Sequence, residues 1–128
     1  MDGHRTTDDF QSSARWELPA AALVGLTPVK ARDLVVECFH FAQSETLARA
    51  KRRLGAGGVD DASIRTTVVG AIRATFHEVG GDYDAPTAPT LRAVVDLLAQ
   101  RAEGWGTPAE VVRHHHQLIR AMLERLPG

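Results

Sequence analysis

Residues 27–55, TPVKARDLVVECFHFAQSETLARAKRRLG, constrain the fold of this chain more than any other stretch. Thr27 is a suitable N-cap, Pro28 suits the first helical position, and Gly55 suits the left-handed residue that ends a helix. The pattern therefore predicts one long helix with a defined start and stop.

This helix is apolar on two faces. On a helical wheel, one face collects the apolar side chains of Leu34, Val35, Cys38, Phe41, Ala42 and Ala48. A second face, well round from the first, collects Val29, Val36, Phe39, Leu47 and Leu54. Only a narrow stripe of Lys30, Asp33, Glu37, Ser44 and Lys51 is left for water. A surface helix needs one apolar face, so we expect something to cover the second.

Three further amphipathic helices follow. The first has Asp60 as N-cap and ends at Gly80-Gly81, and the second begins near Thr87 and stops at Gly104. Trp105 is expected to plug the end of the bundle. The last helix begins at 107–110, Thr-Pro-Ala-Glu, where Thr107 at the N-cap and Glu110 at the third position would form a capping box.

Short connections between such helices favour antiparallel neighbours, and no stretch has the alternating pattern of a strand. We therefore predict an all-α fold, a four-helix up-down-up-down bundle over residues 27–128. Residues 1–26 form a short N-terminal arm whose Phe10, Trp16 and Leu18 are too apolar for a free tail.

Charge and composition limit the possible partners. A formal net charge of −1 gives no general attraction to nucleic acid or anionic lipid. The basic run of Arg49, Lys51, Arg52 and Arg53 is explained by the dipole at a helix C-terminus, and it lacks interleaved aromatics. No stretch approaches the roughly 20 apolar residues of a membrane span, and the single Cys38 suits a reduced compartment. The expectation is a cytoplasmic protein without nucleic-acid or membrane partners.

One constellation points to metal chemistry. Glu37-Cys38-Phe39-His40 is a Glu-x-x-His step, which places a carboxylate and an imidazole on neighbouring turns. In an antiparallel bundle His115 would stand at the same height as His40, because each lies about twelve residues from the matching helix end. Glu37, His40 and His115 could hold one divalent transition metal, so the alternative function is a metal-binding protein or a metal-dependent enzyme. The alternative is a solvated Glu37–His40 pair and a histidine bonded within the bundle.

The favoured function is that of an interaction or structural module without a catalytic or family motif. Its expected interface is the second face, formed by Val29, Val36, Phe39, Leu47 and Leu54. The expected partner is a second copy in a two-fold homodimer, or another protein. Phe39→Asp or Leu47→Asp should then give a folded monomer. The competing interpretation is that the N-terminal arm covers this face within one chain.

Overall fold

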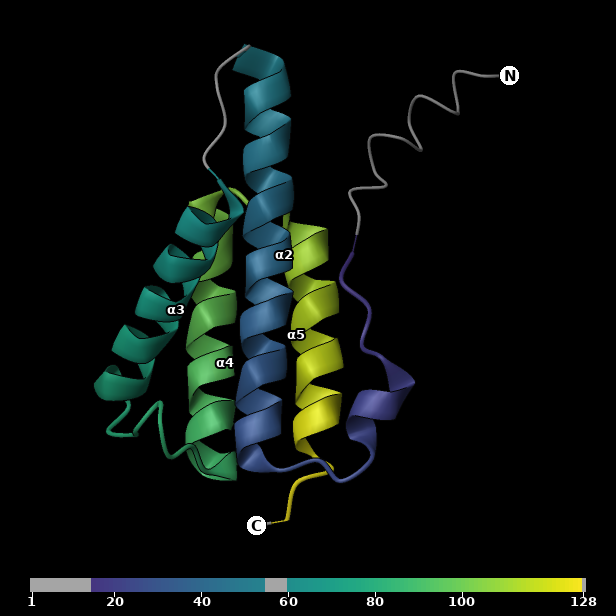
Figure 1. Cartoon of the computed structure of the whole chain (residues 1–128), viewed down its shortest axis with the longest axis vertical. Helices are drawn as coiled ribbons and strands as arrows, with labels where there is room; N and C mark the ends of the chain where they lie inside the picture. The colour runs from purple at the N-terminus through teal and green to yellow at the C-terminus, as the bar shows by residue number, and fades with distance from the viewer. Residues whose placement is uncertain (1–14, 55–59, 128) are drawn as a thin grey trace.

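All regular secondary structure is helical in the part of the chain that the structure, a computed structural model, describes: residues 15–54 and 60–127, without the side chains of 51–54. Over these residues it contains α2 (Pro28–Leu54), α3 (Asp61–Glu78), α4 (Ala88–Ala102) and α5 (Ala109–Leu123), with 3-10 turns η1 (Ala20–Leu23) and η2 (Glu103–Trp105). Each helix packs against the next, and Figure 1 shows them side by side in a bundle. The predicted all-α four-helix bundle is confirmed.

The long helix α2 is the central element of the bundle. It packs against α3 on one side and also contacts α4 and α5, so that more than one of its faces is buried within the chain (Figure 1). Ala31, Val35 and Cys38 on α2 have no exposed surface. The largest fully buried side chains elsewhere are Ile72, Phe76, Leu91, Val94, Val95, Leu98, Ile119, Met122 and Leu123. A helix with three helical neighbours requires a wide apolar arc, which explains the pattern of residues 27–55.

Three helices begin with a side-chain cap, at Thr27 and Asp60 as predicted and also at Thr87, where only the helix start was predicted. The Thr27 hydroxyl accepts the backbone N–H of Lys30 at 3.2 Å, and Asp60 accepts that of Ser63 at 2.8 Å. Thr87 forms a capping box with Thr90. Gly80, with a φ of 76°, ends α3 in the left-handed region that favours glycine. Gly55 lies outside the described residues.

The capping box predicted at Thr107 is wrong. α5 begins at Ala109 with Pro108 as its N-cap, and no side chain caps it. The Thr107 N–H bonds back to the carbonyl of Ala102 at 3.2 Å, directly after Gly106 with its φ of 101°. This turn leaves the Thr107 side chain buried with no hydrogen-bond partner among the described residues, instead of over the first turn of α5.

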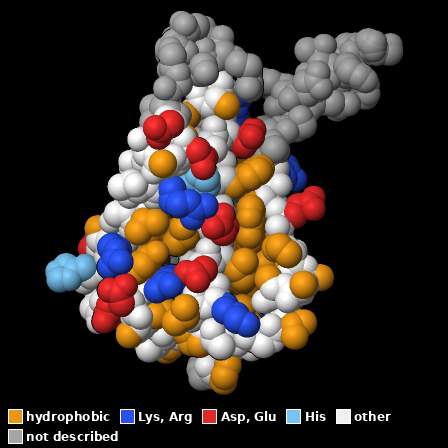
Figure 2. Space-filling model, viewed as in Figure 1, with side chains coloured by type: hydrophobic (Ala, Val, Ile, Leu, Met, Phe, Trp, Pro, Cys, Tyr) orange, Lys and Arg blue, Asp and Glu red, His pale blue; other side chains and the backbone are white. Residues whose placement is uncertain are grey.

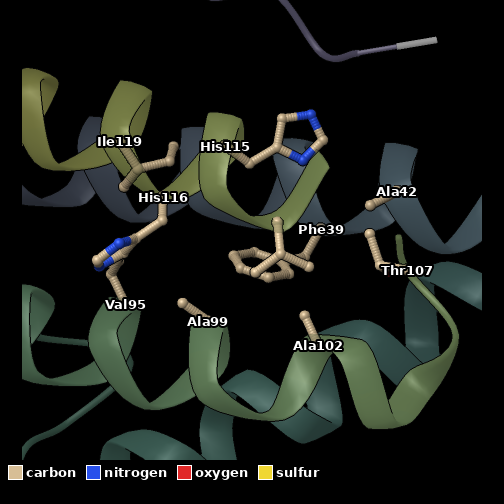
Figure 3. A pocket seen from close by; sticks show the side chains of 10 residues that line it. Phe39, Ala42, Val95, Ala99, Ala102, Thr107, His115, His116 and Ile119 are labelled. Carbon is tan, nitrogen blue, oxygen red and sulfur yellow. The ribbon is translucent and has the colours of Figure 1, made fainter. Parts of the chain in front are cut away.

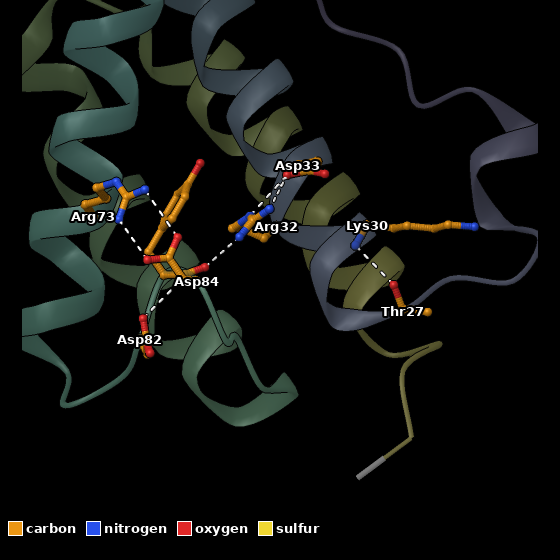
Figure 4. Close-up of polar contacts among 8 residues, drawn as sticks. Thr27, Lys30, Arg32, Asp33, Arg73, Asp82 and Asp84 are labelled. Atoms are coloured by element: carbon orange, nitrogen blue, oxygen red, sulfur yellow. Dashed lines mark hydrogen bonds and ion pairs between the residues drawn. The ribbon is translucent and has the colours of Figure 1, made fainter.

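The connection between α3 and α4 is fixed by an aromatic ring between two arginines. The guanidinium carbons of Arg32 and Arg73 lie 4.5 and 4.3 Å from the ring centroid of Tyr83. Arg32 also donates to the Tyr83 carbonyl at 2.7 Å, and Arg73 binds both carboxylate oxygens of Asp84 (Figure 4). The loop is thereby tied to α2 and α3.

The described part of the N-terminal arm docks on the bundle. It runs as extended chain into η1, and its Trp16, Leu18, Leu23 and Leu26 pack partly buried against the core. Phe10 lies outside the described residues. Trp105 does not plug the bundle end, because 38% of its surface stays exposed. Within the described residues, no helix combines the length and apolarity that a membrane span requires.

Candidate functional site

The residues predicted to form an interface on α2 separate into two groups. Val36 and Phe39 are buried in the protein's own core, and Phe39 lies among side chains of α4 and α5. These two residues are therefore not available to a partner, and Phe39→Asp would disrupt the fold instead of giving a folded monomer. Val29 and Leu47 remain 45% and 38% exposed. The side chain of Leu54 lies outside the description.

The burial of Phe39 follows from the position of α2 among its neighbours. Val95 and Ala99 of α4 and Val112 of α5 surround it, as Figure 3 shows for the labelled residues Phe39, Val95 and Ala99. The neighbouring helices, more than the N-terminal arm, thus cover this part of the second face. Trp16 and Leu18 of the arm add partly buried contacts to the same core.

Glu37 and His40 form a polar cluster with α3. Arg65 donates to Glu37 Oε1 at 3.1 Å, and its terminal nitrogen lies 3.5 Å from His40 Nδ1. On the other side of the ring, His40 Nε2 is 2.9 Å from Asp61 Oδ1, close enough for an ion pair but without hydrogen-bond alignment. A guanidinium beside both predicted ligands disfavours a metal cation there.

His115 points to a different part of the molecule. It is 3% exposed, and its Nε2 accepts the backbone N–H of Trp16 at 2.9 Å. Burial lowers the pKa of His115 to about 4, with the positive charges of His114 and Arg15 acting in the same direction. The ring is therefore neutral at pH 7, as an acceptor nitrogen must be.

The three predicted metal ligands do not converge. Among the described residues, no group of three His, Cys, Asp or Glu side chains is placed to hold a metal ion. His40 and His115 lie at similar heights in the bundle, since Phe39, next to His40 in sequence, lines the same small cavity as His115. Their side chains have different partners, however. His40 lies beside Arg65 and Asp61 of α3, whereas His115 accepts the Trp16 N–H. This geometry gives no support for the predicted divalent-metal site.

Cys38 is not placed to act as a nucleophile. It is fully buried in the face of α2 that packs into the core. Burial raises the pKa of the Cys38 thiol to about 12, which keeps the sulfur protonated at neutral pH. Its role is to fill the core.

A surface groove lies between η1 and α2, and we call it the η1 groove. Its volume is about 280 Å³, and it is lined by Ala21, Ala22, Val24, Lys30, Asp33, Leu34 and Glu37. Val24, at 76% exposed, is the most exposed large apolar side chain described. Figure 2 shows hydrophobic side chains gathered along the boundary between α2 and the arm, next to charged ones. Apolar groups edged by charges are typical of protein interfaces.

A second groove was not foreseen from the sequence, and we call it the Trp105 groove. Its volume is about 330 Å³. Four elements line it: α2 with Phe39 and Gln43, α3 with Thr67, Val68, Ala71 and Ile72, α4 with Leu98, and η2 with Trp105. The only hint in the sequence is the position of Trp105 between two glycines, which leaves the indole outside regular helix.

Comparison with known proteins does not identify the chain. No family model matches it, and the searches of curated proteins and of solved structures likewise give no match.

Proposed function

We propose that this chain is an interaction module that forms a two-fold homodimer through the surface around the η1 groove. The observation that carries the proposal is the exposure of Val24 and Val29, at 76% and 45%, near the start of α2. Large apolar side chains beside a groove stay in contact with water in a monomer, whereas an interface buries them.

The chemistry around the groove suits a second copy of the same chain. In a two-fold dimer, the same surface faces itself, so Val24 of each copy would lie against Ala21, Ala22 and Leu34 of the other. Lys30 lines the groove together with Asp33 and Glu37, which supplies both signs of charge on one surface. A net charge of −1 also gives little long-range repulsion between copies.

Sedimentation of the wild type and of a Val24→Asp/Val29→Asp double variant tests this. Each substitution occurs twice in a two-fold dimer, so the double variant should raise the dissociation constant by about a hundredfold or more. Its helical circular dichroism should be unchanged, because both side chains are exposed. Leu47→Asp is the matched control: it has the same chemistry on the same helix, 18 residues beyond Val29, and should stay dimeric.

Two results would contradict the proposal. The first is a wild-type protein that stays monomeric at high micromolar concentration. The second is a Leu47→Asp variant that dissociates while the Val24→Asp/Val29→Asp variant does not, which would place self-association at the opposite end of α2.

A further inference from the structure

We propose that the Trp105 groove binds a neutral, largely apolar small molecule with one hydrogen-bond acceptor, and that the side-chain amide of Gln43 donates to this acceptor. The inference is independent of the proposed dimer, because the residues of the Trp105 groove and the η1 groove do not overlap.

The size and lining of the groove fit a small ligand. Its volume of about 330 Å³ falls at the lower end of the range of roughly 300–1,000 Å³ found for small-molecule sites. The described residues that line it carry no charge, and most are apolar. A charged group entering the groove would lose its hydration without gaining a counter-charge, so the portion that binds is neutral.

Gln43 supplies the specific polar contact. Its Nε2 is shielded from solvent and has no hydrogen-bond partner within the described part of the chain, so the amide must turn toward the groove to reach a ligand. Among the side chains that line the groove with it, Phe39, Val68 and Leu98 offer no acceptor, and the Thr67 hydroxyl does not bond it. A buried donor without a partner costs roughly 1–3 kcal/mol. A carbonyl oxygen on a ligand would remove this cost, which selects a ketone, an amide or a similar group over a plain hydrocarbon.

Trp105 provides an aromatic surface at the groove. It lines the groove and is 38% exposed, so part of the indole is accessible to a ligand. The backbone next to it is constrained, because Gly106 has a φ of 101° and a Cβ there would lie 2.9 Å from Thr46 Cγ2 of α2. The accessible part of the indole favours a planar aromatic ligand, since offset or edge-to-face ring contacts add to simple burial.

The test uses two probes of equal shape, acetophenone and ethylbenzene, of which only the first has an acceptor. Binding is followed through the signals of the Gln43 side-chain amide and the Trp105 indole N–H in nitrogen–proton NMR spectra of the full chain. Both probes should shift the Trp105 signal saturably. Only acetophenone should move the Gln43 amide protons to the lower field expected of a new hydrogen bond.

Two substitutions separate the parts of the claim. Gln43→Leu keeps the volume and removes the donor, so the preference for acetophenone over ethylbenzene should fall by about tenfold. Ala71→Leu fills the groove from α3 and should abolish saturable binding of both probes. Ala74→Leu, on the exposed side of the same helix, is the matched control and should bind as the wild type does.

Several outcomes would overturn the proposal. The proposal is wrong if neither probe saturates a site at Trp105, if Ala71→Leu binds both probes unchanged, or if Gln43→Leu leaves the preference for acetophenone unchanged. Probe affinity that falls as protein concentration rises would show that a second copy occupies the groove instead. If Gln43→Leu does not fold, the hydrogen bond is judged from the wild type alone. Gln43 amide signals that do not shift when acetophenone is added would then refute it.

Discussion

The contact between His115 and the N-terminal arm predicts a specific dependence of stability on pH. The imidazole Nε2 must be unprotonated to accept the Trp16 N–H at 2.9 Å, and the ring is almost fully buried. Protonation removes the lone pair and places a charge in the core. The folded state therefore resists protonation, and the pKa of His115 falls from its ordinary 6.5 to about 4.

The sign and size of the effect follow from proton linkage. Above pH 6.5 the ring is neutral in both the folded and the unfolded state, so the contact contributes fully to stability. Below pH 6.5 the unfolded state takes up the proton first, and the free energy of unfolding falls by about 1.4 kcal/mol per pH unit until the folded pKa near 4. Between pH 7 and pH 5, His115 alone should account for a loss of about 2 kcal/mol.

Urea unfolding of the wild type and of His115→Gln at pH 7, 6 and 5 measures this loss. Glutamine offers an acceptor oxygen to Trp16 but does not titrate, so the difference between the two proteins isolates His115 from the other histidines. The range from pH 7 to pH 5 lies above the pKa values of Asp60 and Glu78, so these carboxylates do not titrate in it. Both pKa values are lowered, that of Asp60 by the Ser63 N–H and that of Glu78 by Arg101. If both proteins lose the same stability between pH 7 and 5, or if NMR shows the His115 ring titrating near 6.5, the reasoning is refuted.

The two remaining predictions concern the turn that leads into α5. Gly106→Ala should lower the free energy of unfolding by about 1–3 kcal/mol, because φ is 101° and the new Cβ would meet Thr46, whose rotamer is fixed by its bond to the Ala42 carbonyl. Gly70→Ala, in the middle of α3 with open space around it, should instead raise the free energy of unfolding by about 0.5–1 kcal/mol in the same thermal or urea unfolding assay. If the two substitutions change the free energy of unfolding equally, an alanine at position 106 is not strained. Thr107→Val should raise it by about 1 kcal/mol, since the buried hydroxyl has no partner among the described residues, and a clear loss would show that the hydroxyl is satisfied.

The features of the fold that could be predicted are those set by local chemistry. The caps at Thr27 and Asp60 and the helix start near Thr87 were foreseen, because a helix start depends on residues within one turn. Thr107 has the same local pattern but fails, because its turn is fixed by the left-handed Gly106 and by the bond to Ala102. Competition between a cap and such a turn is decided by tertiary packing.

The candidate sites depend on contacts between distant residues and were foreseen only in part. One alternative foresaw His115 as a histidine bonded within the bundle, but its partner Trp16 lies 99 residues away, in a segment without helical periodicity. Likewise, Arg65 beside Glu37 and His40 is 25 to 28 residues away, on another helix. The Trp105 groove requires four elements to be placed together. None of these contacts leaves a periodic signal in the sequence.

The pattern of exposure along α2 reflects its length only at one end. At about 1.5 Å per residue, its 27 residues span about 40 Å, whereas the 15 to 18 residues of α3, α4 and α5 span about 22–27 Å. Neighbours this short cannot cover α2 along its whole length, and its C-terminal end extends beyond the other three helices (Figure 1). Val36 is buried, whereas Val29 and Leu47, on the same face of the helix seven residues before it and eleven residues after it, are exposed. The second apolar face therefore contributes Val36 to the core and leaves apolar surface free on either side of it, where a partner could reach it.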